Sequence, residues 1–155
     1  MKIIKTTNLT KDQKNTLFNL FNNEYPVVIN FTSFSDFENY LKTLNNQLHF
    51  FILNERNQIQ GWEYTFSKEK QRWFAIVLES KIQRKGFGKI LIDKLKDVEN
   101  QLNGWVVEND KELKKNGEPY HSPLDFYLKN DFILDDSNRF ETEKLTTVKI
   151  EWIKN

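Results

Sequence analysis

Gln83-Arg84-Lys85-Gly86-Phe87-Gly88-Lys89 holds two of the five glycines of this 155-residue chain. An apolar strand pattern precedes this segment, and an apolar helical periodicity follows it. A strand, a glycine turn and a helix N-terminus can form an anion site, because glycines let successive backbone N–H groups point at one spot and the helix dipole adds positive charge. One arginine and two lysines add full charges. The segment therefore predicts a phosphate or pyrophosphate site, with an ordinary tight turn as the other interpretation.

Two better-known phosphate motifs do not fit the segment. The dinucleotide fingerprint requires a third glycine three residues further on, where this chain has Leu91. The P-loop requires a Ser or Thr after its Gly-Lys pair, where this chain has Ile90. The glycine turn is therefore of another kind.

The rest of the chain predicts a single α/β domain over residues 1–155, with no internal repeat or linker. The most buried strand comes directly before the glycine turn, because residues 72–79 are apolar on both faces. The expected order is β-α-α-β-β-β-α-β-α-β-β. Strands are expected at 1–6, 48–53, 59–66, 72–79, 105–108, 132–134 and 147–153, and helices at 10–23, from Ser35 through Leu44, from residue 89 to about 103, and from Ser122.

Local signals set the ends of these helices. Thr10 with Gln13, and Ser35 with Glu38, match the capping box. Leu102 continues the apolar seam of the third helix, and Gly104 is expected to end that helix. In the short helix that follows, Pro123 is expected at the first helical position.

Composition excludes several classes of protein. The absence of cysteine rules out disulfides, thiolate metal sites and a cysteine nucleophile, and two distant histidines give a metal site no support. The net charge of +1 argues against a nucleic-acid-coating protein. No apolar run is long enough for a membrane helix, and the N-terminal stretch lacks a signal-peptide pattern. We therefore expect a cytoplasmic protein without nucleic-acid or membrane partners.

Two motifs resemble those of the GCN5-related N-acetyltransferase superfamily. Residues 83–88 match its Gln/Arg-x-x-Gly-x-Gly/Ala signature, and Phe126-Tyr127-Leu128-Lys129-Asn130-Asp131-Phe132 is similar to its Phe-Tyr-x-Lys-x-Gly-Phe segment. The expected order of elements also agrees with that fold. The resemblance implies a mixed, mostly antiparallel central sheet with helices on both faces. It also implies an acetyl-coenzyme A-dependent enzyme that acetylates a primary amine directly and needs no metal.

The resemblance also assigns roles to residues of this chain. Backbone groups of the glycine turn would hold the pyrophosphate of acetyl-coenzyme A, and the end of the central strand would pair with the pantetheine arm. Tyr127 would line the cofactor site and reprotonate the leaving thiolate. The implied cofactor-binding residues are Val77, Leu78, Glu79, Ser80, Gln83, Arg84, Lys85, Gly86, Phe87, Gly88, Lys89 and Tyr127.

Two positions depart from the family pattern. Tyr120 stands where many members carry an Asn, which removes a contact to the thioester or pantetheine. Asp131 replaces the glycine before the final Phe, and an Asp can hold the left-handed conformation there. A non-catalytic acyl-coenzyme A-binding or sensing module of the same fold is therefore the alternative function.

The sequence leaves the general base and the acceptor open. Glu79 and Glu108 end strands, and Glu63 is expected on the polar face of its hairpin, so each can reach the amine or be a solvated carboxylate. His121 can line the acceptor pocket and titrates in a useful range. The acceptor is a small-molecule or peptide amine of unknown identity.

Three further expectations concern loops and assembly. Tyr25, Phe31 and Phe34 suggest an aromatic acceptor pocket, with ordinary core packing as the other interpretation. The polar connector 109–121 is expected to be mobile and solvated. The strand at 147–153, as a sheet edge, could pair across a homodimer.

Overall fold

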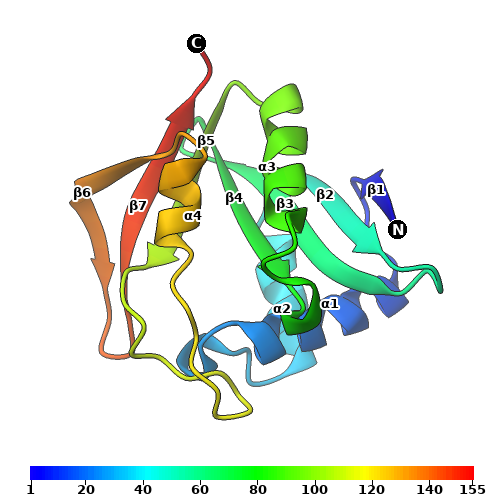
Figure 1. The fold of residues 1–155 in the computed structure, drawn as a ribbon. Helices are drawn as coiled ribbons and strands as arrows, with labels where there is room; N and C mark the ends of the chain where they lie inside the picture. Colours follow the sequence, from blue (N-terminus) through cyan, green and yellow to red (C-terminus); the bar gives the residue numbers. More distant parts are fainter.

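A seven-stranded sheet with the strand order β1-β2-β3-β4-β5-β7-β6 runs through the molecule (Figure 1). The structure is a computed structural model that describes all residues from 1 to 155. Every neighbouring pair of strands is antiparallel except β4 and β5, which are parallel. The strands are β1 (Lys2–Thr6), β2 (Asn45–Leu53), β3 (Ile59–Lys68), β4 (Gln71–Leu78), β5 (Gln101–Val107), β6 (Ile133–Glu141) and β7 (Thr146–Ile153).

Helices cover both faces of this sheet, and each face has its own apolar core. Helices α1 (Lys11–Glu24) and α2 (Phe34–Lys42) pack on one face, against residues such as Phe51 and Trp62. Helices α3 (Phe87–Val98) and α4 (Leu124–Lys129) pack on the other, against Phe74 and Ile150. The predicted fold class and order of elements are confirmed. Two short 3₁₀ turns, Val27–Ile29 and Ser80–Ile82, complete the elements.

The central strand β4 loses one of its two neighbours part of the way along. It pairs with β3 from end to end, but it pairs with β5 only between Trp73 and Asn103. At that point the Asn103 side chain donates from Nδ2 to the C=O of Arg72 at 3.0 Å. Because β4 and β5 separate beyond this contact, the C-terminal half of β4 has an edge with no strand beside it. The glycine turn lies at the end of this half.

The prediction for the end of the third helix is wrong. Helix α3 ends at Val98, and Glu99 is already extended. Leu102 and Gly104 belong to β5, so Gly104 does not end a helix. Leu102 satisfies both patterns, since it continues the helical seam and also alternates with Gly104 and Val106 as an inward residue of a strand. A Cβ on Gly104 would lie 2.9 Å from Cε1 of Phe74, which shows that the glycine makes room for that ring.

Other boundaries differ as well, most of all in β6, which is expected at 132–134 and extends over Ile133–Glu141. The capping box at Thr10 is confirmed, with the Gln13 N–H donating to Oγ1 at 3.1 Å and the Thr10 N–H donating to Gln13 Oε1 at 2.9 Å. The second helix instead starts at Phe34, because Ser33 is the residue that caps it. Pro123 is the N-cap of α4 and not its first helical residue.

The prediction of an edge strand at 147–153 is also wrong. Strand β7 lies between β5 and β6, and both neighbours supply hydrogen-bond partners to it. The edges of the sheet are β1 and β6. No helix of the structure has both the length and the apolar character needed to cross a membrane.

Candidate active site

A cavity of about 380 Å³ opens where β4 and β5 separate. Its walls come from both faces of the sheet. Gly88, Phe126 and Tyr127 belong to helices on the α3–α4 face, whereas Glu24 and Tyr25 belong to the α1 face. The cavity therefore passes through the gap in the sheet and can bring together ligands that enter from opposite sides.

The glycine turn closes the α3 end of this cavity. Gly86 is the N-cap of α3 with a φ of +89°, and Arg84 also has a positive φ of +61°. No side chain caps the helix, so the N–H groups of its first turn have no partner within it. Together with the helix dipole, these N–H groups make the turn a candidate anion cradle. Gly88 leaves room for a ring, because a Cβ there would lie 3.0 Å from Cζ of Phe126.

The basic side chains around the cradle are exposed. Arg84 and Lys85 lie on the surface of the turn. Lys89 pairs with Asp93 one turn further along α3, at 2.7 Å, with both side chains largely exposed. Exposed charges of this kind attract an anion over a distance, and the backbone N–H groups supply the directed hydrogen bonds.

The unpaired edge of β4 presents the backbone of two residues to the cavity. The Glu79 N–H donates to the C=O of Gln60 at 2.9 Å, and hydrogen-bonded pairs alternate along an antiparallel ladder. Val77 and Glu79 therefore turn their backbone groups toward β3, whereas Ile76 and Leu78 turn theirs into the gap. Ile76 is a cavity residue that the sequence reasoning missed.

Side chains already occupy the two carbonyl groups at this edge. The hydroxyl of Tyr25 donates to the C=O of Ile76 at 2.9 Å, and Nε2 of Gln83 donates to the C=O of Leu78 at 2.9 Å. The N–H groups of Ile76 and Leu78 are then what the strand offers to a ligand. An extended ligand with an acceptor group can pair with them as a further strand would.

Tyr127 lies buried on the α4 side of the cavity. The rings of Phe74, Phe126 and Phe132 surround it at centroid distances of 5.6, 5.1 and 5.4 Å. Burial, and to a lesser degree Tyr120 and Glu63, raise the pKa of Tyr127, so its phenol stays protonated at neutral pH. Asp131, after the helix, has a φ of +69°, the left-handed conformation expected at this position.

A second pair of tyrosines forms the wall on the α1 side. Tyr25 and Tyr120 lie 6.3 Å apart between ring centroids, and burial raises the pKa of both. The other aromatic residues expected here, Phe31 and Phe34, pack in the core against Phe37. Tyr25 is thus the member of the expected aromatic set that reaches the cavity.

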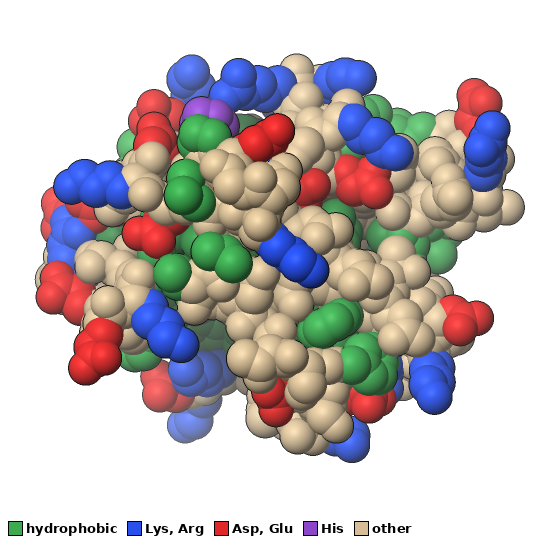
Figure 2. Space-filling model, turned by 90° about the horizontal axis from the view of Figure 1, so that it is seen from below, with side chains coloured by type: hydrophobic (Ala, Val, Ile, Leu, Met, Phe, Trp, Pro, Cys, Tyr) green, Lys and Arg blue, Asp and Glu red, His purple; other side chains and the backbone are tan.

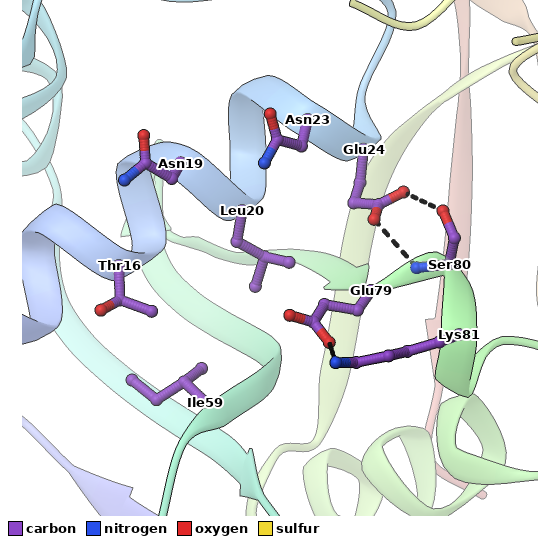
Figure 3. A pocket seen from close by; sticks show the side chains of 9 residues that line it. All are labelled: Thr16, Asn19, Leu20, Asn23, Glu24, Ile59, Glu79, Ser80 and Lys81. Atoms are coloured by element: carbon purple, nitrogen blue, oxygen red, sulfur yellow. Dashed lines mark hydrogen bonds and ion pairs between the residues drawn. The ribbon is translucent and has the colours of Figure 1, made fainter. Parts of the chain in front are cut away.

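Glu24 joins the end of α1 to the end of β4 and to the connector 109–121. It accepts from the Ser80 N–H at 2.9 Å and the Ser80 hydroxyl at 2.7 Å, as Figure 3 shows. Its carboxylate also pairs with Nζ of Lys114 at 3.1 Å, and that Nζ donates to Oγ of Ser80 at 2.9 Å. Both charged side chains are about nine-tenths buried, at 11% and 8% exposed. Ser80 is thus part of a side-chain network, with its N–H already bonded.

The expectation of a mobile connector is wrong for its central part. Leu113 accepts from the Val27 N–H at 2.8 Å, and the Tyr120 N–H donates to the C=O of Glu112 at 2.9 Å. The buried Lys114 adds the ion pair with Glu24. These contacts hold Tyr120 and His121 at the cavity. A negative charge at a helix C-terminus interacts unfavourably with the helix dipole. The position of Glu24 at the end of α1 is the one feature of the sequence that could have indicated a special role for it.

The structure separates the four candidates for the general base. His121 lines the cavity at its exposed rim. Figure 2 shows a surface histidine amid charges of both signs. His121 is exposed, whereas the other histidine, His49, is fully buried. Glu79 points instead into a second pocket beside α1, where it lies 3.4 Å from Lys81 (Figure 3). Glu108 pairs with Arg139 of β6.

Glu63 contradicts its expected place on a polar face. It is 0% exposed, on the α3 side of β3, and neither carboxyl oxygen has a hydrogen-bond partner. Burial raises its pKa. Alternation of polar and apolar residues misled the prediction, because helices cover both faces of this sheet. No group of three or more His, Asp or Glu side chains is arranged to hold a metal ion.

Comparisons with known proteins give structural matches only. Neither a family model nor a curated protein sequence matches the chain. Among solved structures, an aminoglycoside 6'-N-acetyltransferase complexed with coenzyme A superposes with a TM-score of 0.70 at 12% identity, over 99% of this chain and 97% of that one. The Vibrio cholerae spermidine N-acetyltransferase with coenzyme A and spermine gives 0.68 at 15% identity, over 98% and 95%.

A third match carries the family name in its description. A GNAT superfamily phosphinothricin acetyltransferase from Sinorhizobium meliloti, in complex with AcCoA, gives a TM-score of 0.65 at 16% identity, over 100% of this chain and 90% of that one. All three matches extend over nearly the whole chain, and all three are acetyltransferases, the class of enzyme that the two sequence motifs resemble. The chain therefore has the fold of the GCN5-related N-acetyltransferases.

Proposed function

We propose that the protein is an N-acetyltransferase that uses acetyl-coenzyme A to acetylate a primary amine. The observation that carries this proposal is the cavity between β4 and β5. It combines an anion cradle at α3, free strand N–H groups at Ile76 and Leu78, and the protonated phenol of Tyr127. Acetyl-coenzyme A has a pyrophosphate, an arm that carries amides and a thioester. The cradle would bind the pyrophosphate, the strand N–H groups would bind the arm, and the phenol would face the thioester sulfur. Three solved structures of the same fold contain this cofactor.

The glycine turn at the end of the cavity fits the anionic part of coenzyme A. Gly86 takes the left-handed conformation that directs the following N–H groups outward, and Gly88 keeps the turn close to Phe126. Arg84, Lys85 and Lys89 supply the surrounding positive charge. Gln83 orders the turn through its bond to Leu78 and so holds the cradle next to the strand edge.

The reaction then needs orientation and two proton transfers. The amine nitrogen attacks the thioester carbon, the carbonyl oxygen takes negative charge, and the C–S bond breaks to release the thiolate. A strand N–H at the β4 edge is placed to donate to the developing oxyanion. Tyr127 gives its proton to the thiolate, because its buried phenol is protonated at neutral pH.

We assign the acceptance of the amine proton to His121. Of the four candidates, it is the one whose side chain lines the cavity, while Glu79, Glu108 and Glu63 are held elsewhere. A His121→Asn variant is expected to lower kcat and to leave the affinity for coenzyme A unchanged, as measured by thiol release and calorimetry. An unchanged kcat would assign the base to another group or to water.

The primary test follows free thiol released from acetyl-coenzyme A in the presence of a broad panel of amines, with calorimetry of coenzyme A binding beside it. Tyr127→Phe should lower kcat on the order of 10²-fold and leave cofactor affinity unchanged. Tyr40→Phe is the matched control, since it removes a buried hydroxyl outside the cavity that bonds to Tyr64 at 2.9 Å. Cofactor binding with no turnover of any amine would contradict the enzymatic proposal and indicate an acyl-coenzyme A sensor.

A further inference from the structure

Each carboxylate around the cavity is either paired with a cation of the protein or buried in the core. This arrangement limits the number of positive charges that a bound amine can carry. We propose that the acceptor is a monoamine with an aromatic or apolar body, and that the Glu24–Lys114 ion pair excludes polycationic amines. This inference rests on the proposed N-acetyltransferase function and specifies the substrate class of the same cavity.

Glu24 is the one acidic residue in the cavity wall, and all its strong contacts are internal. Its two oxygens accept three hydrogen bonds, from the Ser80 N–H, the Ser80 hydroxyl and Nζ of Lys114. Because Lys114 is as deeply buried as Glu24, the pair carries no net charge into the acceptor end of the cavity. A substrate ammonium would have to displace the Lys114 ammonium to gain a carboxylate partner.

The other acidic residues near the cavity are also unable to pair with a substrate ammonium group. Glu79 pairs with Lys81 in a separate pocket, as Figure 3 shows, and Glu108 pairs with Arg139. Glu63 is fully buried in the core and is not among the residues of the cavity wall. The remaining charged residues of the cavity wall, Arg84 and Lys89, are positive. A polyamine or an aminoglycoside would therefore bury its additional ammonium groups without carboxylate partners, which disfavours its binding.

The acceptor end offers aromatic surface in place of charge. Tyr25 and Tyr120 stand side by side with a 31° angle between their rings, and the Tyr25 hydroxyl is already bonded to the strand. Such a wall packs against a flat or apolar body, and tyrosine faces also attract a single ammonium group before it loses its proton. The chemistry of the wall thus matches an amine with one nitrogen and an apolar remainder.

The first experiment compares acceptors with the wild-type protein. Phenylethylamine and hexylamine represent monoamines, spermidine and kanamycin represent polycations, and thiol release gives kcat/KM for each. We expect the monoamines to exceed the polycations at least about ten-fold. A higher value for spermidine or kanamycin overturns the inference and leaves the N-acetyltransferase function standing. No thiol release with any amine refutes the proposed function itself.

The second experiment removes each charge of the ion pair in turn and measures how the preference among acceptors changes. Lys114→Met leaves Glu24 without its partner, so the kcat/KM ratio of spermidine to phenylethylamine should rise about ten-fold. Glu24→Gln leaves the Lys114 ammonium unpaired, so the ratio of phenylalanine, which carries a carboxylate, to phenylethylamine should rise instead. Lys81→Met is the matched control, because it removes a lysine from the neighbouring Glu79 pair in the other pocket, and it should change neither ratio.

Thermal unfolding and coenzyme A calorimetry establish that each variant is folded and binds cofactor before its ratio is compared. Opposite shifts in the two variants support the inference. Unchanged ratios in folded variants overturn it, and where a variant fails to fold the wild-type acceptor comparison decides by itself.

Discussion

Gly86 and Gly117 have nearly the same backbone φ angle but lie in different parts of the fold. Substitutions at these two residues can therefore test the role of the glycine turn. Their φ angles are +89° and +87°, and an added Cβ would meet nothing within 4 Å at either site. Alanine at either position therefore costs only the left-handed conformation, about 1–2 kcal/mol of unfolding free energy. Gly86 precedes the free N–H groups of α3, whereas Gly117 lies in the connector.

We therefore expect Gly86→Ala and Gly117→Ala to lower stability by similar amounts and to differ in cofactor binding. Only Gly86→Ala should weaken coenzyme A binding, at least about ten-fold, because relaxation of its φ turns the N–H groups away. Chemical denaturation and calorimetry measure the two effects. Equal affinities for both variants would show that the cradle does not bind the cofactor.

Glu63 is a residue whose replacement should stabilise the protein. Its carboxyl is fully buried and unpaired, which costs the free energy of desolvating a polar group without returning a hydrogen bond. Glu63→Leu keeps a similar volume and is expected to raise the free energy of unfolding by about 1–3 kcal/mol at neutral pH. Glu63→Gln is the control, since its amide is just as unpaired. A less stable Leu variant would mean that the carboxyl has a partner in solution, such as a bound water.

At the scale of elements, the sequence predicted the four α-helices, the seven strands and their order, and two of its boundary errors lie where one residue satisfies two patterns. Leu102 fits both a helical seam and a strand, and Ser33 and Ser35 are both able to cap α2. Local spacing cannot decide between such alternatives, because the choice depends on which distant residue packs there. In β5 that residue is Phe74 of β4, whose ring lies against Gly104.

Local sequence patterns also predict one part of the candidate site and fail for the part that depends on contacts between distant residues. The glycine turn and the Tyr127 segment are contiguous, so their residues could be named from the sequence. The Glu24–Ser80–Lys114 network joins three segments that lie 34 to 90 residues apart in the chain, and no local pattern links them. Glu108 was a plausible base for the same reason, since its partner Arg139 lies 31 residues away in the chain.

Gly104→Ala tests the assignment of residues 101–107 to a strand. The new Cβ would lie 2.9 Å from Cε1 and 3.2 Å from Cζ of Phe74, so the ring must move within a filled core. We expect a loss of about 1–3 kcal/mol in unfolding free energy, the usual cost of overpacking. The control substitution Asn100→Ala lies between α3 and β5 and should cost less, because the Asn100 C=O that accepts from the Lys154 N–H belongs to the backbone and is retained. A neutral or stabilising Gly104→Ala would contradict this packing.

At the scale of the whole molecule, two buried ionisable groups on opposite faces of the sheet give opposite pH dependences. His49 of β2 lies on the α1–α2 face, accepts at Nδ1 from Trp62 Nε1 at 3.0 Å, and lies 2.9 Å from Gln47 Oε1 through Nε2. Burial lowers its pKa from 6.5 to about 4. The unfolded chain therefore binds the proton first as pH falls, and the contribution of neutral His49 to stability is lost between pH 6.5 and 4.

Glu63 of β3 gives the opposite pH dependence. It precedes Tyr64, the residue that pairs with His49 across the two strands, and its side chain faces α3. Burial raises its pKa above 4.5, so the folded chain keeps the proton that the unfolded chain releases. Its contribution is fully present below pH 4.5 and is lost as pH rises through the folded pKa. Just above pH 4.5 the two slopes oppose each other, so the unfolding free energy of the wild-type protein should change less with pH there than that of either single variant.

Single variants should separate these two slopes, because the groups lie on opposite faces of the sheet and share no contact. Glu63→Leu retains the histidine, so its stability should fall steeply as pH drops from 6.5 toward 4, by up to about 3 kcal/mol for a pKa displacement of this size. His49→Gln retains the carboxyl, so its stability should fall as pH rises above 4.5. Urea unfolding of both variants across this range measures the two curves. Parallel curves would mean that one of the two groups has its unfolded-state pKa in the native protein, and that the core around it admits water.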